Sequence, residues 1–280
     1  MDNILAILGQ SQAAVDLGCG GGSFHYASYK CRIIGVNVTL NPVTLYRDGN
    51  RIQFVLSRAA EIPLANASVD AVVCNHTFEH FPNYKGVLSE INRVLKPSAM
   101  LWIAIPNGFC FDDNLYRYIF KTDSGGHINR FHFHEFVDDV HTHSDLKLIQ
   151  WIPLFSSFIY LQKPRQERLR FPESARWLYD ISEPLRYAII LTLNLVPRLF
   201  DKLLATRISQ YGWGFVFARG IVSLQPLPCY FNVCWKCGSG HPAKGLKASG
   251  LVKSAFGLGL FSCPGCHAKN VFVKPPRDLS

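Results

Sequence analysis

Hydrophobic residues fall into short runs along the first part of the chain, separated by polar and glycine-containing stretches. Five such runs predict strands, at 13–17, 32–36, 53–56, 69–74 and 100–105. The run at 69–74 is apolar almost throughout, which is typical of a strand that is buried on both faces of a parallel sheet. The pattern therefore indicates a sheet with a covered core.

A helical repeat stands between two of these runs. From Tyr84 to Leu95 apolar positions recur every three or four residues, and Pro97 ends the pattern. Strands that alternate with helices favour the α/β class with a doubly wound, mostly parallel sheet. Further runs at 146–152 and 214–218 bring the expected sheet to seven strands.

The last two runs are separated by about sixty residues that are mainly helical in pattern. We expect residues 155–210 to form a helical insertion, or lid, that caps a pocket or packs on the sheet. Pro197 predicts a kink or break in it. Six apolar residues of this segment share one helical face: Leu185, Ile189, Leu193, Val196, Phe200 and Leu203.

The C-terminal segment carries two Cys-x-x-Cys pairs. Cys234 and Cys237 form the first pair, and Cys263 and Cys266 form the second. This spacing is typical of a zinc ribbon in which four thiolates hold a structural zinc. Disulfides and an iron–sulfur centre are weaker alternatives. A third is covalent attachment of haem to Cys263 and Cys266, which His267 follows directly. We expect residues 1–225 to form the α/β domain and residues 229–275 to form the zinc-ribbon-like module.

A glycine-rich turn follows the first strand. Its sequence is Gly18-Cys19-Gly20-Gly21-Gly22. Glycine in such a turn lets the backbone approach a ligand closely, and ligands of open α/β sheets bind beyond the carboxyl ends of the strands. On its own this turn is compatible with a structural turn or with a dinucleotide site.

The string Val15–Gly22 resembles motif I of the class I S-adenosylmethionine-dependent methyltransferases, especially the small-molecule group that includes ubiquinone-biosynthesis-type enzymes. Four later segments are similar to successive landmarks of that family, in the same order: 60–64, 67–72, 78–81 and 90–97. The resemblance covers residues 13–107 and is specific as a set. It implies a Rossmann-like methyltransferase fold.

The same resemblance implies S-adenosylmethionine as cofactor and assigns positions to it. The implied cofactor-binding residues are Asp16, Gly18, Cys19, Gly20, Gly22, Asn37, Ala60, Glu61, Asn75 and His76. Two positions depart from the family pattern. Asn37 stands where an acidic residue usually accepts from both ribose hydroxyls, and Ala59 stands where aspartate often reaches the adenine. A non-catalytic scaffold with a degenerate site therefore stays open as an alternative function.

Methyl transfer from a sulfonium needs alignment of the acceptor and sometimes removal of its proton. His80 and His127 are the candidate catalytic bases, because histidine titrates near neutrality. A purely structural role for both is the alternative. Four other histidines are expected to be ordinary residues of a helix rather than metal ligands: His132, His134, His141 and His143.

The net charge of +9 is concentrated late in the chain, where residues 229–280 hold seven basic residues and one acidic residue. Such a tail attracts nucleic acid or an anionic membrane surface, or is simply solvated. The sequence favours a small-molecule, lipid-like or saccharide acceptor, and an RNA or protein acceptor held by the basic tail is the alternative. The sequence shows neither a signal-peptide pattern nor a run of about 20 apolar residues. We therefore expect a cytoplasmic protein, with peripheral membrane contact left open.

Overall fold

The computed structural model describes residues 1–39, 51–119, 126–158, 177, 180–220, 222–255 and 258–276. The chain divides into two compact units. The first comprises Met1–Gly108, Gly126–Ile152 and Trp213–Leu227. The second comprises Phe109–Gly125, Pro153–Gly212 and Pro228–Ser280. The division of the sequence into residues 1–225 and 229–275 stays a prediction.

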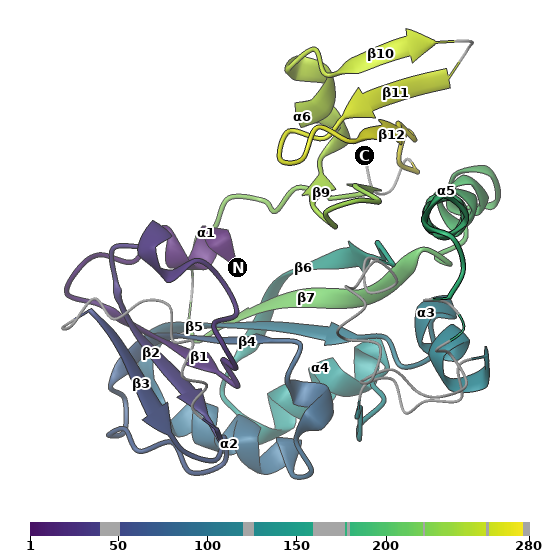
Figure 1. Ribbon diagram of the computed structural model, residues 1–280. Coiled ribbons are helices and arrows are strands. Elements are labelled where there is room, and N and C mark those ends of the chain that lie inside the picture. Colours follow the sequence, from purple (N-terminus) through teal and green to yellow (C-terminus); the bar gives the residue numbers. More distant parts are fainter. Residues whose placement is uncertain are drawn as a thin grey trace. The chain divides into compact units, whose positions relative to one another are not determined.

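A seven-stranded, mostly parallel sheet forms the centre of the fold, as the sequence predicts (Figure 1). Its strands, in spatial order, are β3 (Ile52–Leu56), β2 (Arg32–Asn37), β1 (Ala13–Leu17), β4 (Val69–Asn75), β5 (Leu95–Pro106), β7 (Gln210–Ala218) and β6 (Lys147–Phe155). The pairs among the first five strands are parallel. The strand order changes direction between β1 and β4, and such a switch point is where open α/β sheets bind ligands.

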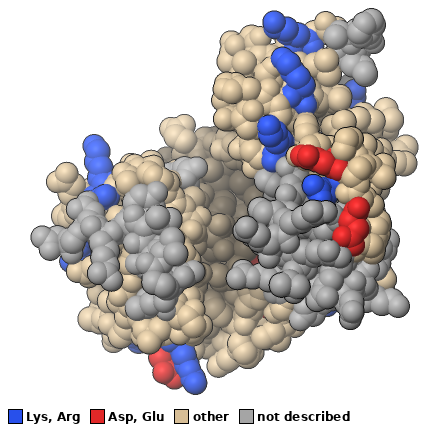
Figure 2. Space-filling model, in the orientation of Figure 1, with Lys and Arg blue, Asp and Glu red and all other residues tan. Residues whose placement is uncertain are grey.

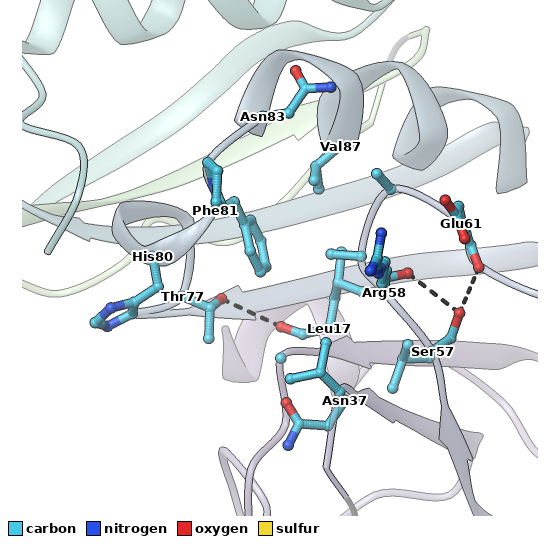
Figure 3. Close-up of a pocket in the computed structure, with 16 residues that line it drawn as sticks. Leu17, Asn37, Ser57, Arg58, Glu61, Thr77, His80, Phe81, Asn83 and Val87 are labelled. Atoms are coloured by element: carbon cyan, nitrogen blue, oxygen red, sulfur yellow. Dashed lines mark hydrogen bonds between the residues drawn. The ribbon is translucent and has the colours of Figure 1, made fainter. Parts of the chain in front are cut away.

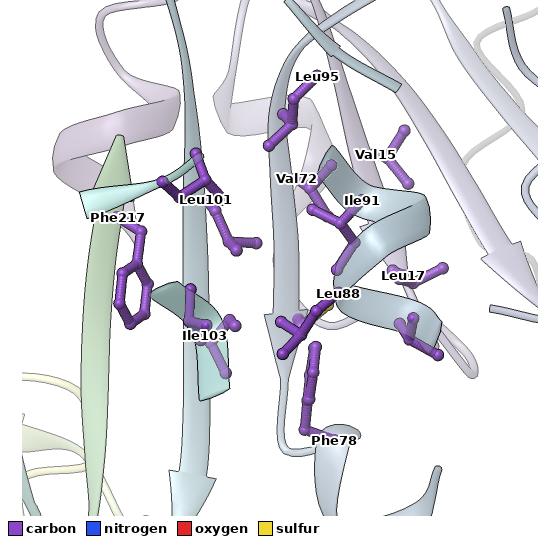
Figure 4. Close-up of a cluster of buried hydrophobic side chains, with 14 of the residues drawn as sticks. Val15, Leu17, Val72, Phe78, Leu88, Ile91, Leu95, Leu101, Ile103 and Phe217 are labelled. Carbon is purple, nitrogen blue, oxygen red and sulfur yellow. The ribbon is translucent and has the colours of Figure 1, made fainter. Parts of the chain in front are cut away.

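One face of the sheet is covered by α2 (Tyr84–Val94) and α4 (Phe133–His143), which lie side by side (Figure 1). Alternate strand residues point to this face because side chains of a strand alternate between its two sides. Figure 4 shows Val15, Leu17 and Val72 meeting Leu88 and Ile91 of α2 in this core. The amphipathic repeat between the fourth and fifth strands is thus confirmed as a helix that packs on the sheet.

The fifth strand starts earlier than the apolar run indicates. It begins at Leu95, which pairs with Val69, and the register then shifts so that Met100 pairs with Ala71. A β-bulge of this kind accommodates extra residues, including Pro97, in one strand of a pair. The remaining short helices are α1 (Asp2–Leu5), η1 (Tyr26–Ser28), η2 (Phe78–His80), α3 (Phe111–Asn114) and the π-helical η3 (Leu115–Ile119).

The second unit contains the long helix α5 (Glu183–Leu204), which lies within the predicted helical insertion. Pro197 lies inside the helix without ending it, so the predicted break is wrong, while the predicted kink stays a prediction. The apolar face is turned to solvent, with Leu203 74% exposed and Leu185 52% exposed. The buried side is largely polar and includes Arg198. Its guanidinium donates to three main-chain carbonyls, so the helix packs by satisfying polar groups rather than by burying its apolar stripe.

The C-terminal segment forms small antiparallel sheets around one short helix. Its elements are β8 (Asn232–Val233), β9 (Gly240–His241), α6 (Ala243–Ala248), β10 (Val252–Ala255), β11 (Leu258–Ser262) and β12 (Lys269–Val271). Its apolar core is small, with Phe231, Val233 and Val273 buried beside Phe155. No helix in the described part of the chain is long and apolar enough to cross a membrane.

Candidate functional site: a cavity at the carboxyl edge of the sheet

A cavity of about 630 Å³ opens where β1, β2 and β4 end, at the switch point of the sheet. Figure 3 shows Leu17 and Asn37 at the ends of their strands, with Phe81 and Val87 on the opposite wall. This volume lies in the range of small-molecule sites, which run from about 300 to 1,000 Å³. All residues that line the cavity belong to the first unit.

The glycine turn forms the floor of the cavity through Gly18. Its φ of +74° lies in the left-handed region, and a Cβ there would stand 2.6 Å from the Cγ2 atom of Thr77. The Gly18 amide donates to the Val36 carbonyl at 2.8 Å, which ties the turn to β2. Glycine is required at this position both for backbone conformation and for space.

Asp16 supports the turn from below and does not line the cavity. Its fully buried carboxylate accepts from the Ser23 amide at 3.0 Å, the Ser23 hydroxyl at 2.8 Å and the Tyr26 hydroxyl at 2.5 Å. Burial raises the pKa of Asp16, and the hydrogen bonds from Tyr26 and Ser23 oppose that rise. The residue holds the two ends of the turn together.

Asn37 lines the cavity at the end of β2, beside the other departure from the family pattern, Ala59. The Asn37 side-chain amide donates to the Thr39 carbonyl at 2.6 Å. This hydrogen bond fixes the amide plane and leaves Oδ1 as the acceptor of the side chain. A single oriented acceptor remains where an acidic residue would supply two oxygens.

The loop that carries Ala60 and Glu61 is held in place by hydrogen bonds with Arg93 and Glu90. Arg93 donates to the carbonyls of Ile62 and Leu64, each at 2.8 Å. Glu90 accepts from the Ile62 amide at 2.7 Å and forms a salt bridge with Arg93 at 2.7 Å. The landmark at residues 90–97 thus acts on the cavity indirectly, by fixing the loop that lines it.

Of the two candidate bases, His80 lines the cavity and His127 does not. His127 Nε2 lies 3.8 Å from Oε1 of Glu79, and His76 Nδ1 lies 3.8 Å from the same oxygen. Glu79 is 1% exposed, and burial raises its pKa to about 7. The sequence reasoning missed Glu79, although this residue stands within the Phe78–Phe81 landmark.

The other predicted cofactor positions lie outside the lining. These are Cys19, Gly20, Gly22, Asn75 and His76, and their role stays a prediction. The lining also contains residues that were not predicted: Ser57, Arg58, Thr77, Phe81, Pro82 and Asn83. They come from the two segments that follow β3 and β4, so the rule that loops after parallel strands form the site would have found them.

The four predicted zinc ligands meet in the C-terminal module. Sγ of Cys234 lies 3.6 Å from that of Cys266, and the same distance separates Cys237 from Cys263. All four sulfurs lie within 4.8 Å of one another. Zinc–sulfur bonds of about 2.3 Å in a tetrahedron place sulfurs about 3.8 Å apart, so the cluster fits zinc. His241 adds a contact, with Nε2 3.4 Å from Sγ of Cys263.

Residues 15–103 match the family model described as a methyltransferase domain. An O-methyltransferase of Pyrenophora dematioidea is 29% identical over 103 residues, which are 33% of this chain and 39% of that protein. A Mycolicibacterium smegmatis protein named as an S-adenosylmethionine-dependent methyltransferase is 32% identical over 100 residues, which are 35% of this chain and 39% of that protein. The chain thus spans about two fifths of the length of these relatives.

A solved methyltransferase structure from Anabaena variabilis aligns with a TM-score of 0.51 at 15% identity, over 76% of this chain and 93% of that one. One from Bacillus halodurans aligns with a TM-score of 0.50 at 15% identity, over 77% of this chain and 96% of that one. These likenesses show a shared fold. Residues 15–103 therefore resemble a methyltransferase domain, and the chain shares the Rossmann-like fold of these solved structures.

Proposed function

We propose that the chain is an S-adenosylmethionine-dependent methyltransferase that binds its cofactor in the cavity at the ends of β1 and β2. The observation that carries the proposal is the meeting of Gly18, Asn37, Ala60 and Glu61 in one cavity of suitable size. The methyltransferase domain assigned to residues 15–103 supports it, because these four positions lie within that domain. When bound, the cofactor supplies the methyl group, and the chain orients the acceptor beside it.

We propose a small-molecule acceptor, which includes lipid-like and saccharide molecules. Apolar side chains of Leu17, Phe81 and Val87 line one part of the cavity, while Asn37 and Glu61 bring polar groups. A mostly apolar site with a few polar groups is typical of small-ligand binding. His80 is the cavity residue that could act on the acceptor directly, and His127 would act only through its neighbours.

The experiment is a transfer assay with cofactor labelled on its methyl group and with metabolite fractions of an extract as acceptors. We expect label to enter a low-molecular-weight fraction with the natural protein. Loss of that label in His80→Gln with cofactor binding retained would support a role of His80 in transfer. Cofactor binding without label in any fraction would favour the scaffold alternative that Asn37 and Ala59 raised.

We also propose that Cys234, Cys237, Cys263 and Cys266 bind a structural zinc ion. The sulfur positions support this, and so does the small apolar core of the module, which needs a further source of stability. Four free thiols, which the described structure shows in place of disulfides, favour an intracellular location as part of the same proposal.

A polymer acceptor is the second candidate. The described part of residues 228–276 holds six lysines and no acidic residue, and each of these lysines is exposed. Figure 2 shows basic side chains on one face of this module. Phosphate contacts from lysine weaken steeply with salt. RNA binding that is lost both at high salt and on removal of residues 229–280 would favour an RNA acceptor over a small molecule.

A further inference from the structure

Glu79 is a buried carboxyl group whose hydrogen-bonding capacity is only partly used within the described residues. Its Oε2 has no hydrogen-bond partner there. Its Oε1 has two imidazole nitrogens at 3.8 Å, beyond hydrogen-bond length. Burying a carboxylate without compensation is strongly unfavourable, so this group needs a proton, a charged neighbour or a cation.

Two histidines, His80 and His127, converge on this carboxyl group. His80 uses Nδ1 for a hydrogen bond of 3.1 Å with the Gly126 carbonyl. A neutral imidazole that donates from Nδ1 presents the lone pair of Nε2, which is the arrangement of a typical metal-binding histidine. His127 directs Nε2 towards Glu79, and one ligand atom from each of the three residues lies within 4.8 Å of the others.

The cluster is built on a fixed backbone. The amides of Ile128 and Asn129 both donate to the main-chain carbonyl of Glu79, at 2.9 and 3.0 Å. The side chain of Asn129 donates to the carbonyls of Phe78 and Phe81, at 3.2 and 2.8 Å. Residues 126–129 are therefore fastened to η2 by hydrogen bonds that do not involve the three side chains of the cluster.

We propose that Glu79, His80 and His127 bind one divalent transition-metal cation, of the size of Zn²⁺ or Co²⁺, at the edge of the cavity. Two ligands of a tetrahedral ion with bonds of about 2.1 Å lie about 3.4 Å apart, close to the separation of 3.8 Å seen here. Two imidazoles and one carboxylate are a common donor set for such ions and leave a coordination position open. The bound charge compensates the buried carboxylate.

The open coordination position would face the cavity, because His80 is exposed and lines the cavity, whereas Glu79 lies on the buried side. A cation held there would attract an acceptor that carries a hydroxyl or carboxylate oxygen. This consequence for the acceptor rests on the proposed function, while cation binding itself does not.

The test counts metal ions and keeps the four-cysteine module intact. Full-length protein with zinc in the module is titrated with Co²⁺ by calorimetry, and its metal content is measured after dialysis. We expect the natural protein to bind one ion beyond the module's zinc. The affinity for that second ion should fall by about tenfold or more in each of Glu79→Gln, His80→Gln and His127→Gln. His134→Gln, an exposed histidine on α4 outside the cluster, is the matched control and should leave it unchanged.

Circular dichroism checks that each variant is folded, and Glu79→Gln keeps the shape of the side chain while removing its charge. A natural protein that binds no second ion overturns the proposal, and so does a second ion that persists in both histidine variants. Cofactor binding is measured on the same samples. Cation binding without cofactor binding would leave the metal site standing and remove the proposed methyl transfer, so the two failures are distinguishable.

Discussion

At the residue scale, two glycines of the same turn have different roles. Gly18 and Gly20 both have positive φ, but only at Gly18 would a Cβ meet another atom, at 2.6 Å from Thr77. Gly20 has nothing within 4 Å. The turn thus combines one position limited by conformation with one limited by conformation and space.

We predict that Gly20→Ala lowers the free energy of unfolding by about 1–2 kcal/mol, the cost of a left-handed residue that carries a Cβ. Gly18→Ala should lose about 1–3 kcal/mol more, because of the added overlap with Thr77. Urea unfolding measures both. In a Thr77→Gly background the difference between the two variants should shrink. An equal loss in both variants with Thr77 present would show that the overlap is relieved without strain.

A second residue-scale prediction concerns Asp70 and Lys96, which form a salt bridge of 2.8 Å. Burial acts to raise the pKa of Asp70, but hydrogen bonds from Lys96, the Ala13 amide and Gln12 outweigh it and lower the pKa. A lowered folded-state pKa adds stability above the unfolded-state pKa of about 3.9, and this stability is lost as pH falls through the folded value.

Asp70→Asn should therefore lower the free energy of unfolding by about 1.5–3 kcal/mol at neutral pH, the range for hydrogen bonds to charged groups. The deficit should shrink as the pH falls below about 4, where the natural carboxylate also gains its proton. Chemical unfolding at several pH values follows this. A deficit that is constant with pH would mean that the carboxylate charge is not what the site uses.

Residue identities in the site were predictable where the family motif fixes them and unpredictable where tertiary contacts do. Gly18, Asn37, Ala60, Glu61 and His80 were predicted and all line the cavity. Glu79 was not, because nothing in a local pattern shows that a carboxyl group in the short helix η2 will be buried and approached by His127, nearly fifty positions later.

At the element scale, the strands and α2 were predictable because sheet burial leaves runs and repeats in the sequence. The orientation of α5 was not. An apolar stripe normally marks the buried side of a helix, yet here Arg198 and Asn194 face inwards. Arg198 donates to the carbonyls of Ser156 at 2.6 Å and Phe231 at 2.9 Å, and these partners come from distant segments that no local pattern shows.

Replacing Arg198 by alanine should destabilise the second unit by about 3 kcal/mol or more, because at least two buried carbonyls lose their donor. Leu203→Ser on the exposed face of α5 should change stability by no more than about 0.5 kcal/mol. Hydrogen exchange of the α5 amides measures whether the loss of stability occurs in this helix. A larger effect of the leucine change would indicate that the apolar face is covered in solution.

At the scale of the whole molecule, the cavity and the cysteine cluster belong to different compact units. Both sites were predictable from motifs in the sequence. They belong to different units because the residues that line the cavity all lie in the first unit, whereas the four cysteines lie in the second. The function of each unit can therefore be tested with the other unit left in place.

Removal of metal by a chelator should unfold the C-terminal module, because thiolate coordination supplies stability that its small apolar core lacks. We expect protease cleavage to appear within residues 228–276 and to disappear when zinc is restored. In His127→Gln, which should lack the proposed cation at the cavity edge, chelation should leave cofactor affinity unchanged, since every lining residue lies in the first unit. Resistance of the metal-free module to protease would contradict a structural role for zinc.

The most direct test of the account is calorimetric titration with S-adenosylmethionine and S-adenosylhomocysteine. Ala60 is exposed and lines the cavity, so Ala60→Arg should fill the site without disturbing the fold, and Ala65→Arg is the matched control on the same loop. We predict saturable binding by the natural protein and by Ala65→Arg, and none by Ala60→Arg. Absence of binding by folded natural protein, or equal binding by Ala60→Arg, would contradict it.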